Sequence, residues 1–333
     1  MNTQLPTGFE ARPGTLNDIP ELATLDANYS TQLFGRALRT EGELRTEWKA
    51  PHFDSKTDSR LVVDSAGRVV GWAEVYDYAP HVRIPSRLRV FPNHTPPEVA
   101  EHLVAWCIER ARSSVGQAPP NSRVVVTQSA FEADAAANAR LLGTGMKPIR
   151  TFLRMQIEMT EPPKPPEWPH GISVRTFVPG QDDVPALEAA REAFRDHWGH
   201  VETPFEEDLA EWRQWIYEDD DFDVDLWFLA IDDGEIVGFC QCYPVGGDDP
   251  RVGLVDELGV KRSHRGRGIA TALLRHAFGV FFRRGKTIVD VGVDAESLTG
   301  ATRLYEKVGM TLNRRNNVYE LELRPGVDLA NQG

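Results

Sequence analysis

The stretch Glu257-Leu-Gly-Val-Lys-Arg-Ser-His-Arg-Gly-Arg-Gly-Ile-Ala-Thr-Ala-Leu-Leu274 predicts an apolar strand, a tight turn and the start of a helix. Gly266 and Gly268 carry no Cβ, so the backbone N–H groups between Arg265 and Ala270 can approach an anion closely. The positive end of the following helix dipole lies at the same place. The stretch therefore predicts a phosphate-binding cradle.

The residues that follow help to decide which family of phosphate-binding folds the cradle belongs to. A helix with one apolar face comes next, and residues 287–293 predict a second, buried strand. A dinucleotide-binding fold needs an acidic residue about 20 positions past the glycines, and Asp290 and Asp294 lie near that spacing. That fold is the weaker interpretation, because no further strand–helix–strand unit follows. A Walker-type loop is excluded, since Gly-Lys-Ser/Thr is missing.

Two motifs, in order, resemble those of the GNAT acetyltransferase superfamily. Its pyrophosphate loop, Arg/Gln-x-x-Gly-x-Gly/Ala, corresponds to Arg265-Gly-Arg-Gly-Ile-Ala270. Its helix Ala-x-x-x-Tyr-x-x-x-Gly-Phe/Met is matched by Ala301, Tyr305, Gly309 and Met310. The resemblance implies an α/β fold with splayed central strands, and acetyl-CoA as the cofactor.

The two halves of the chain repeat one pattern. A strand and a helix entry at 9–22 return at 172–187, with Arg12 matched by Arg175. In each half a strand–turn–strand segment opens on Val-Gly, at 64–72 and at 232–239. The chain thus predicts a tandem pair of related domains.

The first copy lacks the residues that carry the predicted chemistry. Pro96, Pro97 and Glu98 stand where the cradle should be, and Leu141 stands in the place of Tyr305. Proline removes a backbone donor and a carboxylate repels phosphate. We therefore expect a degenerate domain at 1–160 and a catalytic domain at 171–333.

A proline-rich segment at 161–170 is expected to link these domains semi-rigidly. Each domain is predicted to hold a mixed, mostly antiparallel sheet flanked by helices, with splayed central strands. Tandem members of the superfamily include mycothiol synthase, which this architecture resembles.

Composition bounds the class of protein. With 333 residues, 41% hydrophobic and 26% charged, the chain suits two globular domains. No apolar run approaches the roughly 20 residues of a membrane helix, and the N-terminus lacks signal-peptide regions, so we expect a cytoplasmic protein and no membrane partner. The net charge of −13 argues against nucleic acid and favours a small cationic substrate. Cys240 and Cys242 favour core packing over a metal site, and we expect a monomer or homodimer.

Acetyl transfer to an amine needs a base for the ammonium and an acid for the departing thiolate. The resemblance assigns the acid to Tyr305, whose alternative role is aromatic packing. For the base we favour Glu257 over Asp256, because strand neighbours point to opposite faces, although a bulge would reverse them.

The resemblance also supplies the cofactor set. It assigns acetyl-CoA binding to Leu258, Val260, Arg265, Gly266, Arg267, Gly268, Ile269, Ala270 and Ser297. A helix N-cap is the alternative role of Ser297.

Acceptor recognition is expected on the first two helices of the second domain and their loop. Aromatic and acidic residues there predict a cage for a cationic amine, with Trp198, Trp212, Trp215 and Asp196 as its members. The sequence predicts an acetyl-CoA-dependent N-acetyltransferase acting on a small, cationic amine. The alternatives are a mycothiol-synthase-like acetyltransferase and a non-catalytic acyl-CoA-binding or sensing protein.

Overall fold

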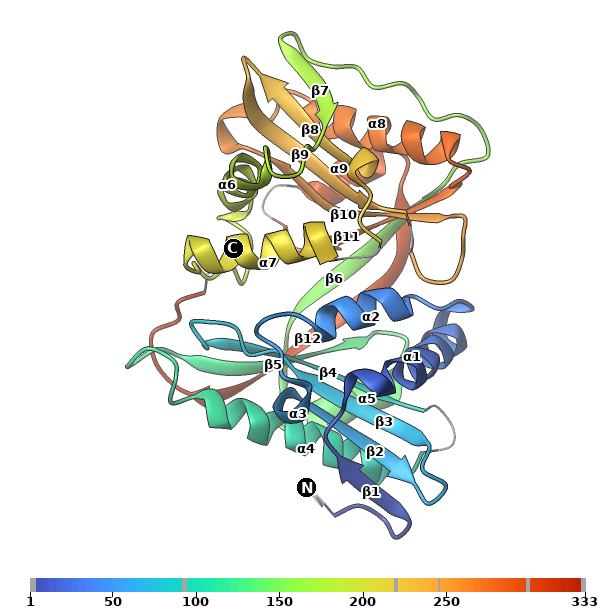
Figure 1. The fold of residues 1–333 in the computed structure, drawn as a ribbon, viewed down its shortest axis with the longest axis vertical. Coiled ribbons are helices and arrows are strands. Elements are labelled where there is room, and N and C mark those ends of the chain that lie inside the picture. The colour runs from blue at the N-terminus through green and yellow to red at the C-terminus, as the bar shows by residue number, and fades with distance from the viewer. Residues whose placement is uncertain (1–3, 92–94, 219–220, 245, 298–299, 331–333) are drawn as a thin grey trace. The chain divides into compact units, whose positions relative to one another are not determined.

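The computed structural model describes residues 4–91, 95–218, 221–244, 246–297 and 300–330. The chain forms two compact units (Figure 1). The N-terminal unit comprises Met1–Thr151 and Arg315–Ala330, and the C-terminal unit comprises Phe152–Arg314. No helix within the described ranges is long and apolar enough to span a membrane.

The N-terminal unit is built on one mixed sheet in the order β1-β2-β3-β4-β5-β12, antiparallel except for β4 and β5. Its strands are β1 (Phe9–Arg12), β2 (Ser59–Asp64), β3 (Val69–Val75), β4 (Arg83–Val90), β5 (Val124–Phe131) and β12 (Thr311–Arg324), whose first residues lie in the other unit. Its helices are α1 (Ile19–Phe34), α2 (Glu41–Trp48), α3 (Ser55–Asp58), α4 (Pro97–Ser114) and α5 (Ala135–Gly143).

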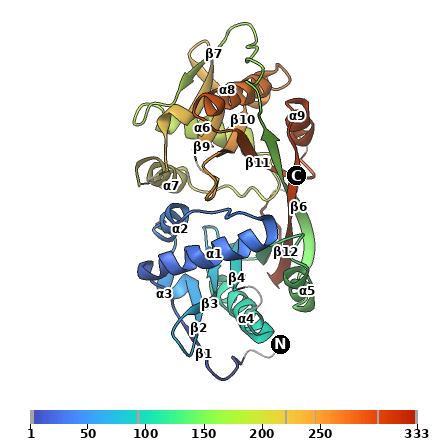
Figure 2. The ribbon, with the colours of Figure 1, turned by 90° about the vertical axis from the view of Figure 1, so that its right-hand side faces the viewer.

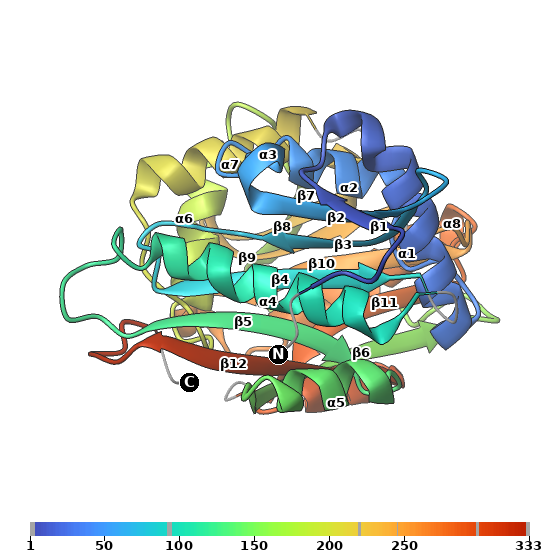
Figure 3. The ribbon, with the colours of Figure 1, turned by 90° about the horizontal axis from the view of Figure 1, so that it is seen from below.

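Helices cover both faces of this sheet, because successive strand residues point to opposite sides. Trp72 of β3 is fully buried in a cluster with residues of α1 and α2. A Cβ on the neighbouring Gly71 would instead contact Leu103 of α4. Figure 3 shows α4 and α1 on opposite sides of the strands.

The C-terminal unit repeats this plan in the order β7-β8-β9-β10-β11-β6, with only β10 and β11 parallel. Its strands are β6 (Lys147–Glu158), which begins in the N-terminal unit, β7 (Ile172–Thr176), β8 (Trp227–Asp232), β9 (Glu235–Tyr243), β10 (Val252–Val260) and β11 (Ile288–Asp294). Its helices are α6 (Asp183–Phe194), α7 (Phe205–Glu218), α8 (Ile269–Arg283) and α9 (Ala301–Lys307).

The helices of this unit pack on the two faces of the sheet, and each face has its own hydrophobic core. Phe239 of β9 packs with residues of α6 and α7 on one face. Cys240 and Cys242 pack on the other face, with residues of α8 and α9. Figure 2 shows α7 and α9 on opposite sides of the strands.

The parallel pair of each unit splays open, as the sequence predicts. In the C-terminal unit β10 pairs with β11 only from Val252 to Val255. In the N-terminal unit β4 pairs with β5 only from Arg83 to Ser86. The expected class, two tandem units of mixed, mostly antiparallel sheet with splayed strands, is therefore confirmed.

The limits of the compact units differ from the expected ranges 1–160 and 171–333. The last strand of the first half, β6, pairs with β11, and the last strand of the second half, β12, pairs with β5. Each unit thus contains a strand from the other half of the chain.

The proline-rich segment at 161–170 consequently lies inside the C-terminal unit. It joins β6 to β7, the two strands at opposite ends of the strand order of this unit. In polyproline II geometry residues 159–171 span roughly 40 Å, more than the roughly 24 Å across six strands. The segment runs along α8, where Trp168 contacts His276 with ring centroids 6.0 Å apart.

Candidate active site

The loop between β10 and α8 has the backbone of an anion cradle. Gly266 and Gly268 have φ of 77° and 92°, a left-handed conformation that side chains rarely adopt. A Cβ on either would meet no atom within 4 Å. Within the described part of the chain, no hydrogen bond engages the N–H groups from Gly266 to Ala270. Open space and free donors at a helix start fit the pyrophosphate of an acyl-CoA.

Arg265 holds this loop against the end of α6 and against β10. Its Nη1 lies 2.6 Å from Asp196 Oδ2, its Nη2 donates to the carbonyl of Ala193 at 2.7 Å, and its Nε donates to the carbonyl of Val260 at 3.1 Å. Hydrogen bonding to Arg265 lowers the pKa of Asp196 below its usual range, with Arg262 adding to the effect. Asp196 therefore holds the cradle loop in place through Arg265, and it does not form part of an acceptor cage.

Two predicted cofactor residues have other surroundings. Arg267 donates to Asp232 at 2.9 Å and does not line the pocket at the splay of β10 and β11, which is described next. Ser297 does not cap α9, whose N-cap is Gly300, and it too is absent from that lining. Neither the N-cap role nor a pocket contact is found for Ser297.

A pocket of about 410 Å³ in the C-terminal unit follows the splay of β10 and β11. It joins the two faces of the sheet. Tyr305 of α9 lines it on one side, and Phe194 and His197, from α6 and the residues after it, line it on the other. Leu258 and Val260 lie between them on β10, on the edge that β11 leaves unpaired. An elongated thiol ester fits such a passage.

Glu257 lies on the α6 side of this passage because β10 contains a bulge. Val255 pairs with Cys242 and Glu257 pairs with Gln241, which leaves Asp256 as the extra residue. Val255 and Leu258 both pack toward α8, so Glu257 faces the opposite side.

Glu257 is not among the residues that line this pocket, and one oxygen of its carboxyl group has no partner within the described part of the chain. Its Oε2 is buried and accepts no hydrogen bond from the described residues. Burial raises the pKa of Glu257 to about 8, and the charge of Asp256 adds to the rise. A carboxyl group of this kind can accept a proton near neutral pH.

Tyr305 is 5% exposed and lines the pocket from α9. Burial raises the pKa of its phenol well above 10, with a further rise from the neighbouring Cys240. The phenol therefore stays protonated at neutral pH and is able to donate.

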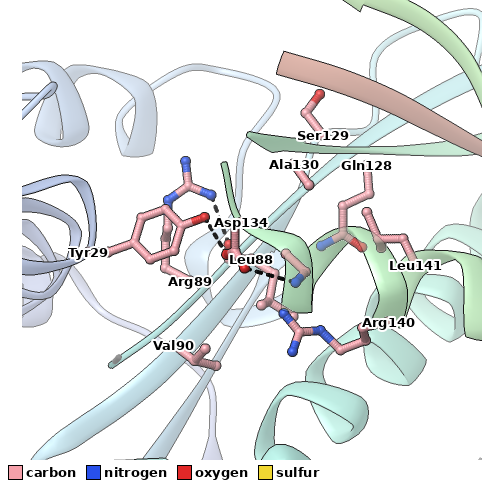
Figure 4. Close-up of a pocket in the computed structure, with 11 residues that line it drawn as sticks. Tyr29, Leu88, Arg89, Val90, Gln128, Ser129, Ala130, Asp134, Arg140 and Leu141 are labelled. Atoms are coloured by element: carbon pink, nitrogen blue, oxygen red, sulfur yellow. Dashed lines mark hydrogen bonds between the residues drawn. The ribbon is translucent and has the colours of Figure 1, made fainter. Parts of the chain in front are cut away.

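The equivalent splay of the N-terminal unit is closed (Figure 4). Its pocket measures about 20 Å³, which accommodates about one water molecule. Tyr29 donates to Asp134 at 2.8 Å across it, and Arg89 Nε donates to Asp26 at 2.8 Å. Leu141 lines this pocket as Tyr305 lines the larger one, and Pro96 and Pro97 begin α4 without N–H donors.

Comparison with known proteins agrees with this geometry. Residues 187–310 match the model of the acetyltransferase (GNAT) family. The crystal structure of a GCN5-related N-acetyltransferase from Sphaerobacter thermophilus is 34% identical, with a TM-score of 0.80 over 98% of this chain and 99% of that one. This chain belongs to the GNAT family. It is an acetyltransferase that depends on an acyl-CoA.

Two relatives of this GNAT chain carry the name mycothiol acetyltransferase. The protein from Thermobispora bispora is 37% identical over 54% of this chain and 60% of its own length. The protein from Streptomyces coelicolor is 28% identical over 93% of this chain and 96% of its own.

In the C-terminal unit, the tryptophans of the predicted cage do not gather around one site. Trp212 packs edge-on against Trp227 in the core under α6, with ring centroids 5.7 Å apart. Trp215 lies beside Glu211 on its own helix, where it opposes the rise that burial causes in the pKa of that carboxyl group. Trp198 packs near β6, where its ring centroid lies 6.3 Å from that of Phe152.

Sequence reasoning missed several residues that line this pocket, three of which carry an ionisable side chain of interest. His197, Arg303 and Lys307 contribute to its wall. Burial lowers the pKa of His197, so its ring is neutral at neutral pH. Arg303 and Lys307, one helical turn apart on α9, place positive charge beside the site of an anionic cofactor. Their spacing was the signal available in the sequence.

Gly268→Glu is expected to abolish acetyl-CoA binding, a loss of at least about 100-fold by calorimetry. The substitution strains a left-handed residue and places a carboxylate in the cradle. Gly285→Glu is the matched control, because Gly285 also has positive φ (78°) and open space but lies at the far end of α8. Equal affinity of the two variants would contradict the cradle assignment.

Proposed function

We propose that this GNAT protein transfers an acetyl group from acetyl-CoA to the nitrogen of a small amine, with Glu257 as base and Tyr305 as acid. The supporting observation is the pocket through the β10–β11 splay, which is lined by Tyr305 on one face of the sheet and by Phe194 and His197 on the other, the face toward which Glu257 points. The N-terminal unit, with its closed splay, serves as the degenerate partner.

Each side chain has a definite part in this proposal. The backbone of 266–270 binds the pyrophosphate, and the free edge of β10 at Leu258 and Val260 orients the pantetheine arm. Bound acetyl-CoA supplies the activated acyl group. Glu257 removes a proton from the acceptor ammonium, and Tyr305 gives its phenolic proton to the departing sulfur.

The net charge of −13 favours a cationic or zwitterionic acceptor. We further propose that the protein acts in the cytoplasm, as a monomer or homodimer. The name of the relatives supports a second candidate function, an acetyl transfer that involves mycothiol.

A panel of primary amines that includes mycothiol with its acetyl group removed tests the proposal, with release of free CoA as the readout. We expect CoA release that depends on an amine and on Tyr305. Binding of acetyl-CoA without CoA release for any amine would contradict the proposal and favour a sensing protein.

A further inference from the structure

The sheet of the C-terminal unit has a polar face beside the passage. On β11, Val289, Val291 and Val293 pack under α8 and α9, so Asp290, Gly292 and Asp294 face the other way. Antiparallel pairing places Gln156 of β6 beside Asp290 and Arg154 beside Gly292 on that same face. Glu257 faces this side too, and Arg154 therefore shares a surface with the proposed base.

Arg154 differs from its neighbours in having no partner. Gln156 donates to Asp290 at 2.7 Å, and Arg314 lies 3.7 Å from the same carboxylate. Among the described residues, Arg154 makes no hydrogen bond or ion pair. Its side chain is partly buried, but none of its nitrogen atoms is buried, so the guanidinium can still bind an acceptor that approaches from outside.

The guanidinium of Arg154 occupies the space left by Gly292, the residue paired with it on β11. A Cβ on Gly292 would lie 3.8 Å from Arg154 Nη1, so the guanidinium rests over the glycine backbone. Phe152, two residues earlier on the same face, meets Trp198 from the segment after α6. Together they form an apolar wall beside the guanidinium.

The charge of Arg154 reaches the bulge next to Glu257. The Asp256 side chain extends to solvent, but the surrounding protein raises the pKa of its carboxyl group, and the charge of Arg154 opposes the rise. Arg154 therefore lies on the same face as Glu257 and within electrostatic range of the residue beside it.

We propose that Arg154 binds an oxygen of the acceptor, a carboxylate or carbonyl carried close to the amine, and thereby selects amines that have one. This inference rests on the proposed function. A guanidinium offers a planar fork of donors that such an oxygen group accepts. The residue comes from the strand that ends the first half, so that half contributes to acceptor choice.

Three matched amines test it: L-alanine with a carboxylate, L-alaninamide with a neutral carbonyl, and isopropylamine with neither. The measured quantity is kcat/KM of each amine for wild type and Arg154→Met. The intrinsic reactivity of each amine cancels when the two proteins are compared. We expect the wild-type preference for an oxygen-bearing amine over isopropylamine to shrink about 10- to 100-fold in the variant.

The affinity for acetyl-CoA should not change, which separates acceptor binding from a general defect. Arg154→Lys keeps the charge without the fork and should give an intermediate preference, and it serves if the Met variant does not fold. Arg275→Met, on α8 and paired with Glu167 at 3.0 Å, is the control and should match wild type. A larger effect with alanine than with alaninamide identifies the group as a carboxylate, and equal effects identify a carbonyl.

An unchanged preference in Arg154→Met, or wild-type turnover restricted to amines without such an oxygen, overturns the inference and leaves the proposed function standing. Wild type that turns over no amine while binding acetyl-CoA overturns the proposed function itself.

Discussion

Glu257→Gln is expected to lower kcat by a factor of about 10² to 10⁴ while acetyl-CoA binds as in wild type. The amide keeps the size of the side chain but cannot take the proton of the acceptor ammonium. Steady-state kinetics with a saturating amine, together with calorimetry of acetyl-CoA, measure the two effects. A variant with full kcat would place the base elsewhere or in solvent.

The pH dependence of the rate gives a second test of the same residue. Glu257 must be ionised to act, so the wild-type rate should rise with pH until the pH passes about 8. Because Asp256 raises the pKa of Glu257 through its charge, Asp256→Asn should move this rise to lower pH. The shift is partial, since burial is the larger cause.

Stability should change in the opposite direction to activity. Between the ordinary value of 4.5 and about 8, Glu257 holds a proton in the folded state but loses it on unfolding. Wild type therefore loses stability as pH rises through this window. The Tm of Glu257→Gln relative to wild type should increase from pH 4 to pH 8, as calorimetric melting curves will show.

Tyr305→Phe is expected to lower kcat by a similar factor of about 10² to 10⁴. The substitution removes one oxygen and keeps nearly all the buried area, so the fold and the affinity for acetyl-CoA should persist. The departing sulfur then lacks its proton donor. Single-turnover kinetics should be used, so that chemistry and not product release limits the rate.

The matched control is Tyr319→Phe, which removes a buried hydroxyl from the N-terminal unit. Tyr319 is 4% exposed and donates to Asn138 at 2.6 Å. That variant should lose some stability and keep its kcat. If both variants retain the wild-type single-turnover rate, the hydroxyl of Tyr305 has only a packing role.

Much of the fold and the cradle could be predicted, because local rules determine them. Gly266 and Gly268 need left-handed backbone, and the motif around Tyr305 pointed to that residue as the acid. Strand alternation left one of Asp256 and Glu257 to face the site. The bulge that fixes the face of Glu257 could be considered but not located. It depends on the pairing of β10 with β9, which no short stretch of sequence specifies.

The acceptor-binding residues were predicted less well, because amino-acid composition does not show which residues contact one another. Asp196 looked like a cage residue, yet its partner Arg265 lies 69 positions away in sequence. Trp212 supplied aromatic character and was needed in the core. Arg154 escaped notice because it lies in the range expected for the degenerate domain.

The exchange of last strands was likewise hidden. β6 and β12 end equivalent halves, so by pattern alone either strand suits either sheet. Local sequence sets the alternation of a strand, but tertiary contacts choose its neighbour. The proline-rich segment marked a real change in the chain and not the limit of a compact unit.

The exchange of β6 and β12 also determines which of the two sheets can be completed first during synthesis. The first sheet must wait for Thr311–Arg324, made some 170 residues after β6 begins its exit, a delay on the order of 10 to 30 s at ordinary rates of synthesis. Throughout that interval the edge of β5, with Val124, Val125 and Val126 along it, has no neighbour on one side. The part of the protein that is made first is thus finished last, and its bare edge is where a nascent chain is most exposed to aggregation.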